Sequence, residues 1–187
     1  MPILPSTRFA PRARRRWTLL AILALVSAAV LAWSSAEPPT LTSTGSVSVP
    51  PLHSSVDGYE AGRVVLSTTD GATAFDVRIA RTNAERTHGL MEVTELPDGV
   101  GMWFAYDSER DGGFWMKNTL VDLDIVYVAE DGTIVDVANA VPCPPDTTCP
   151  TYPSAAPFAG VLEVAGGTMD AIGAGIGDRA ELLDDRG

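Results

Sequence analysis

Residues Leu123–Asn139 read LDIVYVAEDGTIVDVAN, and this stretch decides the fold. Two runs rich in β-branched and aromatic residues, Leu123–Ala129 and Thr133–Asn139, flank an acidic turn that ends in glycine at 130–132. Runs of this kind, joined by an Asp-Gly turn, are typical of a β-hairpin. The centre of the chain therefore predicts two antiparallel strands.

The segments on either side extend the same pattern. Asp70-Gly71 joins Arg63–Thr69 to Ala72–Ala80 in a second predicted hairpin. A capping box at 82–85 predicts a short helix that Gly89 ends. Further elements are expected at Gly101–Tyr106, Gly113–Asn118, Gly160–Ala165 and Arg179–Leu183 (strands) and at Thr168–Ile172 (helix). These elements predict a mainly β (α+β) domain, compact, antiparallel and barrel-like, with two short helices.

The N-terminal region predicts a membrane segment in front of this domain. Residues 1–16 contain five arginines, and the run Trp17–Trp33 is interrupted by only two polar residues. A helix over 17–36 is long enough to span the hydrocarbon core, and the basic flank keeps the N-terminus cytoplasmic. The small residues at 34–36 also fit a cleaved signal peptide. Either interpretation exports the remainder, as a single-pass membrane protein or a secreted one.

Charge and composition change after this segment. Residues 37–187 carry 8 basic against 24 acidic side chains, a net charge of −16, which disfavours nucleic acid as a partner. Residues 37–59 are rich in Pro, Ser and Thr, which predicts a solvated linker. We expect residues 60–184 to form the β-rich globular domain.

Five short sequence motifs follow one another along this domain. They are Glu85-Arg86-x-x-Gly89-Leu90-Met91, Gly101-Met102-x-Phe104, Phe114-Trp115-Met116-Lys117-Asn118-Thr119, Leu123-Asp124-Ile125, and Leu162-Glu163-Val164 with Gly177-Asp178. Over about residues 62–184 the chain thereby resembles the family catalogued as domain of unknown function 192. The resemblance implies a compact β-rich domain, often exported or membrane-tethered, with no established activity.

Charged residues inside apolar strand patterns mark a candidate polar pocket. Asp124 shares a strand face with Val126 and Val128, and Glu163 lies between two apolar residues. An inward carboxylate needs a partner or must become neutral, and Lys117, the only lysine, is a candidate partner. An ion pair that fixes strand register is the simpler interpretation. The functional interpretation is a ligand-binding pocket formed by Trp115, Lys117, Asn118, Asp124 and Glu163.

The two cysteines enclose a proline-rich loop. Cys143 and Cys149 are spaced neither as a redox CxxC motif nor as part of a complete zinc site. Outside the cytoplasm we expect the two thiols to form a structural disulfide.

No metal or cofactor is predicted from the remaining motifs. The acidic turn 107–112 lacks the bidentate glutamate of a calcium loop. Met91, Met102 and Met116, with His88, have the soft or imidazole groups that suit Cu(I), although methionine more often packs in a core. We interpret His88 as a solvated or capping helix residue rather than a general base.

These features favour binding over catalysis. Nucleophile elbow, zinc-protease and P-loop motifs are absent from the sequence. We expect a membrane-tethered extracytoplasmic binding or accessory module at the cell envelope. Its partners would be the bilayer, through 17–36, and a small polar ligand or an envelope protein. One alternative is an enzyme acting on envelope glycan or lipid-linked material through Lys117, Asp124 and Glu163, and another is a soft-metal carrier using Met91, Met102 and Met116.

Overall fold

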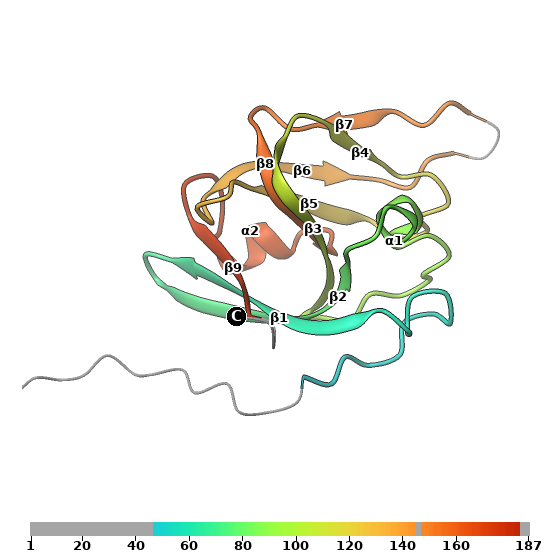
Figure 1. The fold of residues 1–187 in the computed structure, drawn as a ribbon, viewed down its shortest axis with the longest axis horizontal. Coiled ribbons are helices and arrows are strands. Elements are labelled where there is room, and N and C mark those ends of the chain that lie inside the picture. Colours follow the sequence, from blue (N-terminus) through green and yellow to red (C-terminus); the bar gives the residue numbers. More distant parts are fainter. Residues whose placement is uncertain (1–46, 145–146, 184–187) are drawn as a thin grey trace, which may run out of the picture. The chain divides into compact units, whose positions relative to one another are not determined.

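The computed structural model describes residues 47–144 and 147–183, which form nine strands and two short helices (Figure 1). The strands are β1 (Glu60–Thr68), β2 (Gly71–Ala80), β3 (Val100–Arg110), β4 (Gly113–Trp115), β5 (Leu123–Val128), β6 (Ile134–Ala140), β7 (Thr151–Pro153), β8 (Phe158–Ala165) and β9 (Arg179–Leu183). The helices are α1 (Asn83–His88) and α2 (Thr168–Ile172). The predicted mainly β fold with two short helices is confirmed.

Seven strands form one sheet in the order β6-β5-β8-β3-β2-β1-β9, and β4 pairs with β7 in a separate two-stranded sheet. Neighbouring strands are antiparallel except β2 and β3, which are parallel. Parallel neighbours need a crossover connection. Here α1 and residues 89–99 provide it, and they place Leu90, Val93 and Leu96 against one face of the sheet.

The large sheet is curled but not closed into a barrel. Side chains of β1 and β5 belong to one buried cluster, although three strands separate β1 from β5 in the sheet. The edge strands β6 and β9 meet at a single bridge, Thr133 to Arg179, beside a hydrogen bond from Ile134 N–H to the Asp178 carbonyl (2.8 Å). The predicted barrel-like closure is therefore wrong, because the twisted sheet brings its two edges together at one corner only.

Each face of the sheet has its own core. The inner core lies on the concave face and includes Val64, Phe75, Trp103, Leu162 and, from α2, Met169. The outer core lies on the convex face, beneath the crossover and the β4 segment. Its members include Val56, Leu90, Met102, Phe104, Met116, Ile125 and Tyr127. Along β3 and β5 the residues of the two cores alternate, so neighbouring side chains of these strands lie in different cores.

Residues 47–59 differ from the predicted linker. Val56 is fully buried and Val49 is 7% exposed, and both pack in the outer core. The Arg78 guanidinium of β2 donates hydrogen bonds to the carbonyls of Val49 (3.2 Å) and Tyr59 (3.3 Å). Composition did not reveal this packing, because the few apolar residues of the segment meet partners far away in the sequence.

The capping box at the start of α1 is confirmed. The Thr82 hydroxyl accepts the Glu85 N–H (3.2 Å), and the Glu85 carboxylate accepts the Thr82 N–H (2.8 Å). The Thr82 N–H bond to the carboxylate is the main cause that lowers the pKa of Glu85, and the Arg81 N–H, which the same carboxylate accepts (2.8 Å), lowers it further. Gly89 ends the helix with a φ of 54°, a value that glycine adopts without strain.

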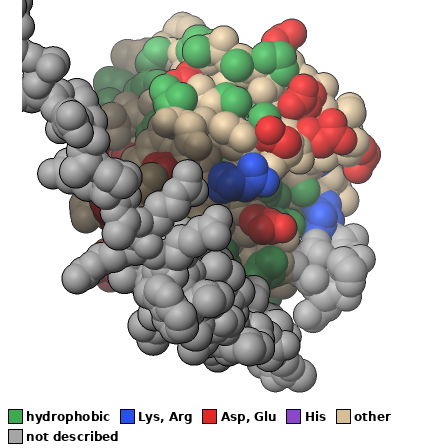
Figure 2. Space-filling view, turned by 90° about the vertical axis from the view of Figure 1, so that its left-hand side faces the viewer, with side chains coloured by type: hydrophobic (Ala, Val, Ile, Leu, Met, Phe, Trp, Pro, Cys, Tyr) green, Lys and Arg blue, Asp and Glu red, His purple; other side chains and the backbone are tan. Residues whose placement is uncertain are grey.

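Within 47–144 and 147–183, no helix combines the length and apolar character that crossing a bilayer requires. The membrane segment predicted at 17–36 lies outside the described residues. On the face shown in Figure 2, acidic side chains gather along one side and basic ones are few, in keeping with the acidic composition.

Candidate functional site

A surface hollow of about 590 Å³ lies between α1 and the segment that follows β4. Its lining comes from two stretches that the crossover and the β4 segment bring together. The lining residues are Asn83, Ala84, Thr87, His88, Met91, Trp115, Lys117 and Asn118. Three of the residues predicted as ligand-binding, Trp115, Lys117 and Asn118, therefore meet in one hollow.

A smaller cavity of about 20 Å³ lies beside this hollow and shares its residues Thr87, His88, Met91, Trp115 and Lys117. That volume is close to the space one water molecule needs. The cavity reaches a fourth predicted residue, Glu163 of β8. The hollow and the cavity together form the candidate site.

Glu163 is buried without a partner. Its side chain belongs to a residue that is 5% exposed, and no hydrogen bond or ion pair of the described residues uses its carboxyl group. Burial is the cause that raises the pKa of Glu163 to about 8, from an ordinary value of 4.5. The group is therefore mainly a neutral carboxylic acid at pH 7, able both to donate and to accept a hydrogen bond.

His88 brings a second unsatisfied group to the same cavity. Its Nε2 is fully buried and has no hydrogen-bond partner. His88 is half-buried as a residue, so its interpretation as a solvated or capping residue fails only for Nε2, which is closed off from solvent and makes no hydrogen bond. Arg86, also in the lining, is already engaged, because its guanidinium donates to the carbonyl of Ala105 (2.8 Å) and to Asn83 Oδ1 (2.5 Å).

A tight turn presents the residues at the mouth. The Thr119 N–H donates to the Met116 carbonyl (3.2 Å), and Asn118 adopts a φ of 55°, a left-handed conformation that Asn tolerates. This turn ends β4 at Trp115, which is why the strand predicted to reach Asn118 is shorter. The Lys117 ammonium lies 5.2 Å from the centre of the Trp115 ring, and Trp115 is 48% exposed.

Residues 64–182 match the family model DUF192, described as "Uncharacterized ACR". The chain belongs to the DUF192 family. This confirms the resemblance that the sequence motifs indicated. The matched region includes both the hollow and Glu163.

Two solved structures resemble this DUF192 chain. A candidate transcription regulator from Sinorhizobium meliloti 1021 is 36% identical, covering 66% of this chain and 95% of that one, with a TM-score of 0.62. A protein of unknown function from Novosphingobium aromaticivorans DSM 12444 is 37% identical, covering 72% and 93%, with a TM-score of 0.64. No curated protein matches the chain significantly.

Asp124, the fifth predicted residue, lies elsewhere in the DUF192 domain. It accepts hydrogen bonds from the N–H groups of Gly167 (3.1 Å) and Met169 (2.8 Å) and from Asn139 Nδ2 (2.7 Å). Asp124 is on the inner-core face of β5, whereas Glu163 is on the outer-core face of β8. The expected pairing of Asp124 with Lys117 is wrong, because the backbone at the start of α2 and Asn139 take its oxygens.

The three methionines of the soft-metal alternative do not line one cavity. Met91 lines the hollow, where its sulfur accepts a weak hydrogen bond from Asn118 Nδ2 (3.9 Å), but Met102 and Met116 are buried in the outer core. Among the described residues of the DUF192 chain, no group of three His, Cys, Asp or Glu side chains is arranged to hold a metal ion.

The predicted disulfide between Cys143 and Cys149 is formed, with Cα atoms 5.4 Å apart. Neither cysteine lines the hollow or the cavity. Cys143 packs against the outer core, so the bond tethers the loop after β6 to the body of the DUF192 domain.

Sequence reasoning named His88 and Met91 only as candidate groups for Cu(I) and left them out of the predicted ligand-binding set of this DUF192 domain. A usable signal was present: the capping box fixes the start of α1, and Gly89 fixes its end, so His88 must occupy the last turn. Nothing local showed that this turn would lie against Glu163, about 75 residues further along the chain.

Proposed function

We propose that this protein is an exported, membrane-tethered binding module whose ligand occupies the hollow between α1 and residues 115–118. The observation that carries the proposal is that two polar groups line one cavity beside that hollow: His88 Nε2, which is buried without a partner, and the carboxyl of Glu163, a 5% exposed residue with no hydrogen bond among the described residues. Buried polar groups are nearly always hydrogen-bonded, and each unpaired one costs about 1–3 kcal/mol. A ligand that supplies the missing partners offsets this cost.

The lining favours a small polar ligand. Neutral Glu163 can donate and accept, His88 Nε2 can do either according to its tautomer, and the Lys117 ammonium donates at the mouth. The exposed Trp115 ring adds an apolar surface. A hydroxyl- and amide-bearing molecule, such as a sugar of the envelope glycan, matches this combination of groups.

Export is supported by the disulfide, because cytosolic proteins rarely keep such bonds. The apolar run at 17–36 is the proposed tether, with the N-terminus cytoplasmic and the domain outside. Cell fractionation that recovers the chain in the membrane, with the disulfide oxidised, is the expected result. Recovery in the cytosol with two free thiols would contradict this location.

The nucleic-acid function suggested by the description of the S. meliloti protein is not favoured for this chain. Residues 37–187 carry a net charge of −16, which repels a phosphate backbone.

A binding experiment tests the proposed site directly. The full chain is titrated with N-acetylglucosamine and with acetamide, and ¹H–¹⁵N NMR spectra are recorded. We expect saturable shifts at His88 and Lys117 for at least one probe, and a loss of affinity of about tenfold in Glu163→Gln. Glu95→Gln, which changes an exposed glutamate in the same way, is the matched control. Shifts that persist unchanged in Glu163→Gln would overturn the proposal.

Acid catalysis at the same cavity is the second candidate, and one observation favours it. A carboxyl group with a pKa of about 8 is protonated at neutral pH, as a general acid must be. Asp124 takes no part, since it faces the inner core. An enzyme would cleave a glycan probe and lose turnover in Glu163→Gln while still binding it, whereas a binding module would show no turnover.

A further inference from the structure

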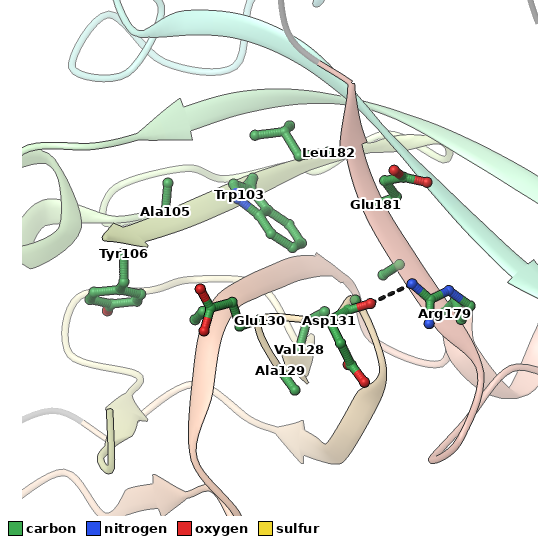
Figure 3. Close-up of a pocket in the computed structure, with 13 residues that line it drawn as sticks. Trp103, Ala105, Tyr106, Val128, Ala129, Glu130, Asp131, Arg179, Glu181 and Leu182 are labelled. Atoms are coloured by element: carbon green, nitrogen blue, oxygen red, sulfur yellow. Dashed lines mark hydrogen bonds between the residues drawn. The ribbon is translucent and has the colours of Figure 1, made fainter. Parts of the chain in front are cut away.

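A second pocket opens between β3, β9 and the turn after β5 (Figure 3). It measures about 340 Å³, within the range of sites for small molecules. It shares no lining residue with the hollow or the cavity near Glu163. The pocket is therefore a separate feature that the proposed function leaves unused.

An aromatic ring forms the inner part of this pocket. Figure 3 shows the Trp103 indole projecting from β3 among the lining residues. Trp103 is only 7% exposed, and the indole lies so close to Gly160 that a Cβ there would be 2.1 Å from its Cζ2. No hydrogen bond within the described parts of the chain uses the indole N–H. Trp103 thus offers the pocket both an aromatic surface and an unused donor.

The rest of the pocket is predominantly acidic at its polar positions. Three acidic residues, Glu130, Asp131 and Glu181, and one basic residue, Arg179, belong to the lining. Glu130 and Asp131 lie in the turn, whereas the Glu181 side chain leaves β9 on the face opposite the inner-core residues Ala180 and Leu182 (Figure 3). Arg179 donates a hydrogen bond to the Asp131 backbone carbonyl, which holds it at the turn (Figure 3). Apolar side chains, among them Val128 and Leu182, complete the walls.

We propose that this pocket binds a small organic cation that also carries an oxygen acceptor, such as an amino alcohol. The carboxylates and the indole ring attract the cation, and the apolar walls accommodate its methyl or methylene groups. The oxygen of the ligand accepts the unused indole N–H of Trp103. Cations already contact an aromatic ring nearby in the protein. The guanidinium groups of Arg86 and Arg110 lie 4.8 and 4.7 Å from the centre of the Tyr106 ring.

An organic cation fits this pocket better than a metal ion. No three His, Cys, Asp or Glu side chains among the described residues form a metal-binding group. A ligand that fills a cavity of about 340 Å³ against an aromatic ring must also have a body of several heavy atoms.

Choline and its neutral isostere 3,3-dimethylbutan-1-ol provide the matched test, because they have nearly the same shape and differ in charge. The full chain is titrated with each, and the Trp103 indole N–H resonance is followed by NMR. We expect a saturable shift with choline and affinity about tenfold weaker for the isostere. Tetramethylammonium, which has the charge but no oxygen, should bind several-fold more weakly than choline.

Substitutions in the lining test the role of the carboxylates. Glu130→Gln should weaken choline binding about threefold at low salt, and high salt should reduce the difference. Glu181→Gln, on the opposite face of β9, should have a smaller effect. Glu95→Gln, an exposed glutamate outside the pocket, should leave choline binding unchanged.

Three results would overturn the proposal: no shift of the Trp103 indole up to about 50 mM choline, equal binding of choline and its isostere, or unaltered affinity in Glu130→Gln. Glu163→Gln should leave choline binding intact, so this proposal and the proposed function can fail separately.

Discussion

Two buried acids of neighbouring strands, Asp124 of β5 and Glu163 of β8, have opposite environments. Both are almost inaccessible, at 0% and 5% exposure. Asp124 accepts three hydrogen bonds, whereas Glu163 accepts none from the described residues. Register places Ile125 opposite Glu163 and Asp124 opposite Val164, and alternation then directs the two carboxyl groups into different cores.

The difference separates a structural acid from a candidate functional one. Helix α2 begins at Gly167, which has no side chain to cap the free N–H groups of the first turn. Asp124 supplies that cap from another strand, so its charge is fully used within the fold. The Glu163 carboxyl makes no hydrogen bond that stabilises the fold. A ligand in the cavity beside it would supply the partner that the described residues do not.

The largest expected loss of stability is that of Asp124→Ala. It removes three hydrogen bonds at once and leaves the first N–H groups of α2 buried without partners, so we expect a loss of about 3–4 kcal/mol in unfolding free energy. Urea unfolding measures it. Asp170→Ala, on an exposed residue of α2, is the control and should change little. Equal losses in the two variants would remove the structural role assigned to Asp124.

Glu163→Gln should have the opposite sign and depend on pH. Because the folded-state pKa of about 8 exceeds the ordinary 4.5, the folded state binds more protons between these values, and stability falls as pH rises through that window. The variant should lack this slope and exceed the wild type by about 4–5 kcal/mol at pH 9, with little difference at pH 4. Urea titrations at both pH values provide the measurement. Parallel pH profiles would show that Glu163 is already paired.

Replacing both Cys143 and Cys149 with serine should have a smaller effect. The bond closes a short loop, so the chain-entropy model gives a loss of about 2 kcal/mol. Cys143 packs on the outer core, and Glu163 lies on the outer-core face of the sheet. This variant therefore tests whether the packing of that face depends on the disulfide-bonded loop. Unfolding with and without reductant measures the loss, and reductant should not affect the serine variant. A loss as large as that of Asp124→Ala would contradict a local role.

Lys117→Met should have the smallest effect on stability, within about 0.5 kcal/mol. Lys117 is exposed, and among the described ion pairs none includes it. Thermal melting measures the change, and a clear loss would contradict the exposed placement of Lys117 outside the described ion pairs. Lys117→Arg keeps the charge over Trp115 and serves as the control. We expect Lys117→Met to weaken ligand binding in the hollow while Lys117→Arg retains most of it.

Much of the fold was predictable because its signals are local. The two hairpins, the capping box of α1, its end at Gly89 and the disulfide all appear where the sequence indicates them. The short strand β7 and the packing of 47–59 were not predicted, because their partners lie far away along the chain.

The candidate site was predictable only in part. Trp115, Lys117, Asn118 and Glu163 do line connected cavities, although Asp124 does not, and His88 was assigned to solvent. Alternation identified two inward acids but could not tell which would find partners, since the N–H groups that satisfy Asp124 begin a helix more than 40 residues later.

The sequence by itself determined the two hairpins, where α1 is capped, and which thiols pair, because each depends on residues close together. Only the tertiary structure decided that the sheet stays open, that Glu163 lies beside His88, and that Trp103 lines a second pocket. The physical reason is that register and curl arise from contacts between distant strands. Those contacts determine which buried polar groups find partners in the fold and which are left for a ligand.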